Sequence, residues 1–78
     1  MNIEELAEIL DEFVDLGAVE LREGDVLGEE IPVDSKDMLR VLTRIESRYA
    51  VKFSPRDLAC LRTVGDVLDV VRRQGGMR

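Results

Sequence analysis

The chain has 78 residues, of which 45% are hydrophobic and only three aromatic, so we expect one small domain with a mainly aliphatic core. It has no histidine and one cysteine, which excludes an internal disulfide, a multi-cysteine zinc site and the commonest general base of enzymes. No apolar run could cross a bilayer, and the first residues are acidic where a secretory signal would be basic. We therefore expect a soluble, cytoplasmic monomer with no membrane insertion.

The net charge of −6 is unevenly distributed. Residues 1–34 contain twelve acidic residues and one basic residue, a net charge of −11, whereas residues 35–78 contain five acidic and ten basic residues, a net charge of +5. Binding to nucleic acid needs a cationic surface that faces the phosphates, and single-strand binding also needs interleaved aromatic residues. We therefore expect no nucleic-acid partner.

The first predicted helix covers residues 3–16. Asn2 with Glu5 three positions later has the pattern of a capping box, and apolar residues follow at helical spacing. Gly17 is a typical helix stop. A long connection without periodicity then runs from 17 to 34. Its apolar residues are expected to fix it to the helices; they are Val26, Leu27, Ile31 and Val33.

Three more helices are predicted in the second half, over residues 35–49, 55–61 and 64–74. Each follows a short polar residue with an acid three positions later; the pairs are Asp34 with Asp37, Ser54 with Asp57, and Thr63 with Asp66. Alternation typical of strands is absent. We predict an all-α fold in a single domain of residues 1–78, a small bundle of three main helices plus one short helix, with a long loop between the first two helices. Residues 75–78 are expected to be a flexible tail.

The inventory of reactive groups argues against catalysis. Cys60 lies in the apolar sequence Leu-Ala-Cys-Leu, so we expect an unreactive thiol in the core. The glycines form no phosphate-binding loop, and the carboxylates lack the spacing of a calcium loop. We therefore predict neither a metal site nor an enzyme.

Ser35 has two interpretations. If Asp34 caps the second helix, Ser35 is its first residue, and serine is common at helix starts for reasons of capping alone. Alternatively, a phosphate attached to this hydroxyl would be stabilised by unpaired backbone amides and by the helix dipole. A separate enzyme would then attach it, so Ser35 would need no base beside it.

The stretch from Asp34 to Val71 resembles the acyl carrier proteins of the phosphopantetheine-binding family. The family's Asp-Ser attachment motif matches Asp34-Ser35, and an acid follows at Asp37. The segments "LTRIESRYAVKFSPRDL" and "TVGDVLDVV" are similar to the family's second, third and closing helices.

This resemblance implies that Ser35 carries covalent 4′-phosphopantetheine, which holds acyl intermediates as thioesters in fatty acid, lipid or polyketide biosynthesis. It implies a phosphopantetheinyl transferase and acyl-transferring or condensing enzymes as partners. It also implies an acyl pocket between the second and third helices, near Leu42, Ile45, Phe53, Leu58 and Leu61.

Four cations recur every fourth residue along the second helix; this basic stripe consists of Lys36, Arg40, Arg44 and Arg48. Like charges at this spacing repel, so something should offset them. Either the acidic first half neutralises the stripe, or the stripe docks partners with Leu39 as an apolar anchor. The expected partner-recognition residues are Asp34, Lys36, Asp37, Leu39, Arg40 and Arg44.

Two features differ from the family pattern. Ile31-Pro32-Val33 precedes the motif, with Leu27-Gly28 farther upstream, and Lys36 stands where the family prefers an apolar residue. These differences favour an alternative, a helical protein–protein interaction module without the cofactor. A carrier of aminoacyl or peptidyl groups is a further alternative.

Overall fold

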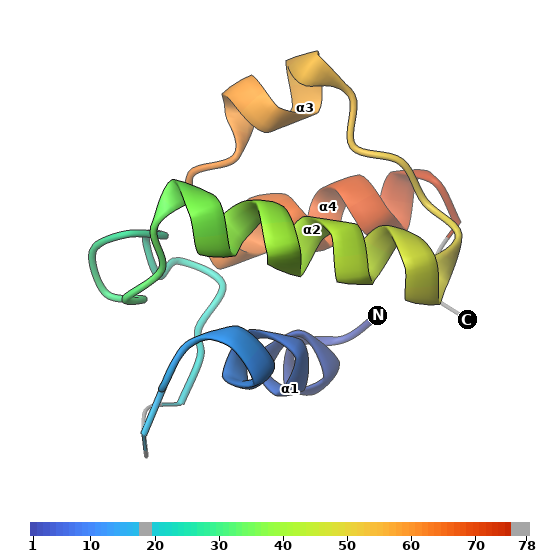
Figure 1. Cartoon of the computed structure of the whole chain (residues 1–78). Coiled ribbons are helices and arrows are strands. Elements are labelled where there is room, and N and C mark those ends of the chain that lie inside the picture. The colour runs from blue at the N-terminus through green and yellow to red at the C-terminus, as the bar shows by residue number, and fades with distance from the viewer. Residues whose placement is uncertain (18–19, 76–78) are drawn as a thin grey trace.

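The structure, a computed structural model, describes residues 1–17 and 20–75. In these ranges the chain forms four helices, α1 (Ile3–Phe13), α2 (Ser35–Tyr49), α3 (Pro55–Cys60) and α4 (Val64–Arg73), and only isolated β-bridges beside them (Figure 1). The predicted all-α fold is confirmed. Of the predicted tail, all but Gly75 lies outside the described residues.

Each helix begins where its capping pattern predicts. The polar side chain before each helix accepts a hydrogen bond from the amide three residues later, and in three of the four helices the acid at that position bonds back to the cap; the caps are Asn2, Asp34, Ser54 and Thr63. These bonds satisfy backbone amides that have no partner inside the helix.

The predicted ends of the helices agree less well with the structure than their starts do. α1 ends at Phe13 because Val14 is extended, with φ −136° and ψ 153°. The prediction of residue 16 was wrong because the apolar stripe continues beyond the helix: Leu16 is buried although it lies in the connection. α3 and α4 end at Cys60 and Arg73, one residue earlier than predicted.

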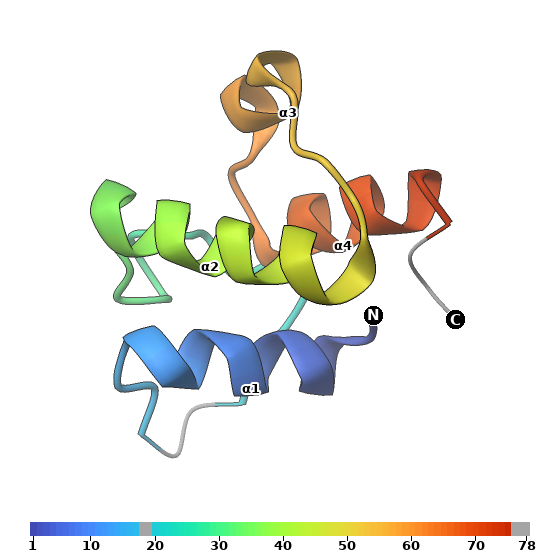
Figure 2. The same ribbon diagram turned by 45° about the vertical axis from the view of Figure 1, so that its right-hand side comes forward.

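α1 and α2 pack side by side and run in opposite directions, while α4 runs in the same direction as α2 (Figures 1 and 2). Apolar residues of these three helices and of the long connection form one core, and among the described residues no polar or charged side chain is buried. α3 lies on the opposite side of α2 from α1 in both views and contributes no buried residue.

The long connection is fixed to the start of α4 by backbone hydrogen bonds. Leu27 donates to the carbonyl of Arg62 at 2.8 Å, Val64 donates to Asp25 at 3.0 Å, and Gly65 donates to Glu23 at 2.8 Å. Three of the four apolar contacts predicted for this segment are present, since Ile31 and Val33 are buried and Leu27 packs against the core, whereas Val26 is not part of the core cluster. Residues 23–33 of the connection therefore have a defined position beside the start of α4.

Cys60 is exposed, so its prediction as a core residue was wrong. The apolar sequence around it suggested burial, but α3 is a six-residue helix that stands away from the core.

No helix in the described parts of the chain has the length and apolar character needed to span a membrane.

Candidate functional site

Ser35 is the first residue of α2 and is exposed. The Asp34 side chain before it is the cap: its Oδ1 atom accepts a hydrogen bond from the Asp37 amide at 2.8 Å. The Asp34 carbonyl accepts the first helical bond, from the amide of Met38, at 2.8 Å. The capping is therefore done by Asp34, and the Ser35 hydroxyl is not needed for it.

The start of α2 provides donors for an anion. Within the described chain, the amides of Ser35 and Lys36 have no hydrogen-bond acceptor, as is usual for the first turn of a helix. These amides and the helix dipole place partial positive charge beside the Ser35 hydroxyl. These donors are consistent with the second interpretation of Ser35, in which a phosphate is attached to its hydroxyl.

An open apolar groove of about 640 Å³ begins at Ser35. The residues that line it come from the connection, from α2, from α3 and from Leu61 directly after α3. Its apolar lining consists of Leu27, Val33, Met38, Leu39, Leu42, Leu58 and Leu61.

Three of the five residues predicted for the acyl pocket line this groove: Leu42, Leu58 and Leu61. The other two lie elsewhere. Ile45 is fully buried in the core, and Phe53 packs against the core while its amide donates to the Glu46 carboxylate at 2.8 Å.

Sequence reasoning missed the groove residues Leu27, Val33 and Met38. Met38 was detectable, because it lies three residues after Ser35 and therefore on the same side of the helix. The position of Leu27 depends on the backbone bonds between the connection and α4, which no local pattern reveals.

The cations of the basic stripe differ in their ion pairing. Arg44 forms an ion pair with Glu12 of α1, and its guanidinium carbon lies 5.7 Å from the centroid of the Phe13 ring. Lys36 and Arg40 form no ion pair with any described residue. Leu39, between them in the sequence, is 59% exposed.

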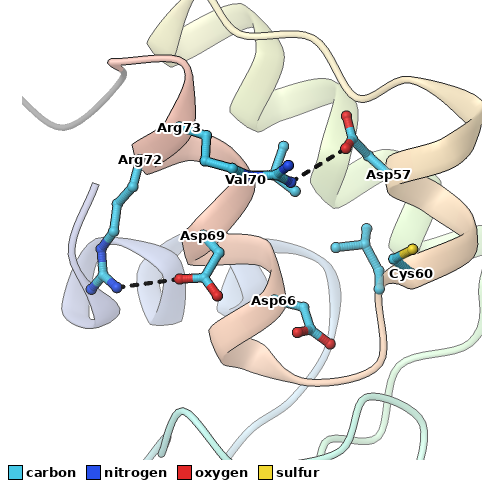
Figure 3. Close-up of a pocket in the computed structure, with 8 residues that line it drawn as sticks. Asp57, Cys60, Asp66, Asp69, Val70, Arg72 and Arg73 are labelled. Carbon is cyan, nitrogen blue, oxygen red and sulfur yellow. Dashed lines mark hydrogen bonds and ion pairs between the residues drawn. The ribbon is translucent and has the colours of Figure 1, made fainter.

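A second cavity, of about 310 Å³, lies between α3 and α4 and is lined by polar groups (Figure 3). Its acids already have partners: Asp57 pairs with Arg73 at 3.4 Å, and Asp69 pairs with Arg72 at 3.5 Å. Asp66 caps α4. Among the described residues no group of acids or cysteine could hold a metal ion. The groove at Ser35 is therefore the better candidate site.

Comparison with known proteins shows the family of this chain. The sequence model of the family described as "Phosphopantetheine attachment site" matches residues 2–71. The chain belongs to the phosphopantetheine-binding carrier family.

Similar proteins include the meromycolate extension acyl carrier protein of Mycolicibacterium aurum, 34% identical over 68 residues, which cover 87% of this chain and 70% of that protein. The acyl carrier protein of Rhodococcus erythropolis is 31% identical over 91% of this chain and 78% of its own length. That of Chlamydia caviae is 29% identical over 97% of this chain and 100% of its own length.

Family membership confirms three predictions: the resemblance to acyl carrier proteins, the cofactor 4′-phosphopantetheine, and the role of a carrier rather than a catalyst. The residues around Ser35 fit this cofactor. The exposed hydroxyl offers a point of attachment, the amides of Ser35 and Lys36 beside it have no acceptor within the described chain, and the groove offers apolar surface.

Proposed function

We propose that this carrier holds acyl groups on 4′-phosphopantetheine attached to the Oγ atom of Ser35. The observation that carries the proposal is the position of Ser35: it is exposed at the positive end of α2 and lines an apolar groove. When bound, the cofactor supplies a terminal thiol that holds an acyl group as a thioester. The names of the relatives favour a role in fatty acid or other lipid biosynthesis, and a role in polyketide biosynthesis stays a prediction.

The chain's own residues would position and shelter this arm. The amides of Ser35 and Lys36 would donate to the phosphate, while Asp34 holds the first turn of α2 in place. Leu42, Leu58 and Leu61 would cover apolar parts of the cargo and exclude water from them. Each methylene removed from water stabilises the loaded form by about 0.8 kcal/mol.

We further propose a phosphopantetheinyl transferase and acyl-transferring or condensing enzymes as partners. They would contact the chain around the start of α2, at the predicted recognition residues Asp34, Lys36, Asp37, Leu39, Arg40 and Arg44. A location in the cytoplasm, a monomeric state and the lack of a nucleic-acid partner also stay predictions.

Loading in vitro tests the attachment site. The purified chain is incubated with coenzyme A, Mg²⁺ and a broad-specificity phosphopantetheinyl transferase, and the intact mass is measured. We expect a gain of one phosphopantetheine, its loss in Ser35→Ala, and full loading of Ser47→Ala, a matched control because Ser47 is also an exposed serine of α2. A gain that persists in Ser35→Ala would exclude Ser35 as the attachment residue.

The alternative is an interaction module with this fold and no cofactor, which Lys36 directly after Ser35 favours. It predicts no mass gain with any transferase, including the one from the same cells. A carrier of aminoacyl or peptidyl groups would load in the same way, and only the mass of the cargo in protein from those cells would distinguish it.

A further inference from the structure

The outer surface of α2 combines an exposed apolar side chain with unpaired cations beside the attachment site. We propose that this surface, made of Lys36, Leu39 and Arg40 and called here the α2 face, docks enzymes that present carboxylates around an apolar recess. The inference rests on the proposed function, because a docked enzyme must receive the arm carried by Ser35.

Leu39 has the position of an anchor. It is 59% exposed, and Leu58, at 40%, is the other exposed large hydrophobic residue in the described ranges. Leu39 lines the groove that begins at Ser35 and also a second groove of about 450 Å³, whose lining includes Phe13 and Thr43. Leu39 therefore lies between the two grooves. An exposed leucine in this position could insert into an apolar recess of a partner.

The charges beside Leu39 have no partner within the described chain. Lys36 and Arg40 are one turn apart, and with Leu39 they span an arc of about 100° on the helix. Like charges at this spacing repel each other along a helix. The acid-rich first half leaves them without an ion pair, although its Glu12 neutralises Arg44.

The two interpretations of the basic stripe therefore apply to different residues. Arg44 connects α1 to α2 through Glu12 and Phe13, so it has a structural partner already. Lys36 and Arg40 remain available to a second molecule. We exclude Arg44 from the α2 face for this reason.

Charge complementarity identifies the partner's chemistry. Two cations around a leucine are matched by aspartates or glutamates around an apolar recess, and such pairs raise association rates and exclude partners with a basic surface. Leu39 lies about one helical turn from Ser35, so an enzyme docked on it would cover the mouth of the groove. An anionic membrane fits less well, because the whole chain is negatively charged and has one strongly exposed leucine here.

Photo-crosslinking tests the α2 face directly. The full chain carries p-benzoylphenylalanine in place of Leu39, its loading is checked by mass, and it is irradiated in an extract of the cells it comes from. The crosslinked enzyme and residue are identified by peptide mass spectrometry. We expect acyl-handling enzymes, crosslinked at a surface rich in aspartate and glutamate.

Charge variants decide whether the cations matter. In Lys36→Glu/Arg40→Glu the crosslink yield should fall about ten-fold, and replacing the partner's mapped carboxylates with lysine should restore it. Arg56→Glu is the matched control, since Arg56 is an exposed cation that lines neither groove, and it should keep the full yield. Thermal melting would verify that every variant is folded.

Four results would overturn the inference: crosslinks to a lysine- or arginine-rich surface, equal yields in the reversed and control variants, crosslinks between two copies of the chain, or charge-dependent cosedimentation with phosphatidylglycerol vesicles. An unloaded chain would contradict the proposed function instead. Its crosslinks would still report on the α2 face, so the two failures are distinguishable.

Discussion

Asp34 and Ser35 are neighbours in the sequence with separate roles in the structure. The Asp34 carboxylate accepts the amide of Asp37, whereas the Ser35 hydroxyl points to no capping bond within the described chain. One residue therefore stabilises the start of α2, and the other remains free for attachment. Substitutions should separate the two roles.

We predict that Asp34→Ala lowers the free energy of unfolding by about 1 kcal/mol, because the cap of α2 is lost. Asp34→Asn should keep most of that stability, since asparagine caps about as well, and Ser35→Ala should be close to neutral. Urea denaturation followed by circular dichroism measures all three. Equal stability of the alanine and asparagine variants at position 34 would show that the cap contributes little.

The sequence predicted the roles of the helix caps well, but it predicted the burial of single residues less well. The helix caps Asn2, Asp34, Ser54 and Thr63 could be identified because each bond spans only three residues. Burial depends on where a whole helix lies. Cys60 was predicted in the core and is exposed, and Ile45 was predicted in the acyl pocket and lies in the core.

At the scale of elements, α3 contributes Leu58 to the lining of the groove but makes few contacts with the core. It has six residues and none is buried. It is tied to α4 through the Asp57–Arg73 pair and, through the segment before it, by hydrogen bonds of 2.9 and 2.6 Å between the Lys52 backbone and the Gln74 side chain. Contacts with a bound acyl chain would therefore add appreciably to its stability.

Leu58→Ala tests whether α3 contacts a bound acyl chain. Leu58 is 40% exposed and lines the groove, so its loss should change the stability of the unloaded chain by less than about 1 kcal/mol. Acylation should raise the Tm of the parent chain through buried methylenes, and this gain should shrink in Leu58→Ala.

The control for that experiment is Val67→Ala, a fully buried position that does not line the groove. It should lower the Tm of the unloaded and acylated forms alike. An identical gain on acylation in the parent chain and in Leu58→Ala would place the acyl chain elsewhere.

The sequence predicted the helices but not the position of the long connection. The four helices and their starts follow from capping and apolar spacing. The position of the long connection follows from backbone bonds between residues 23–27 and 62–65, which are distant in the sequence. Since that connection supplies Leu27 and Val33, only part of the groove could be predicted.

For the whole molecule, the acids at the third positions of α3 and α4 link stability to pH. Hydrogen bonds from the amides of Arg62 and Thr63 lower the pKa of Asp66 below its ordinary value of 3.8. The amide of Ser54 lowers the pKa of Asp57 below 3.8 in the same way. The unfolded chain therefore binds more protons than the native chain in moderately acidic solution.

We predict that stability from these acids is fully present above about pH 4 and is lost as the pH falls through their lowered native pKa values. The Tm should thus be nearly constant from about pH 5 to 7 and fall below pH 4. In Asp66→Asn the fall should be shallower, because one of the linked groups no longer titrates. Calorimetry across this range measures both profiles, and parallel profiles would contradict the role of Asp66.

The central claim, that Ser35 bears the arm, is tested most directly on protein purified from its native cells, where its own transferase is present. Peptide mass spectrometry would locate the modified residue. The account predicts one phosphopantetheine on Ser35. Protein that is always unmodified at Ser35, or modified at another residue, would contradict it.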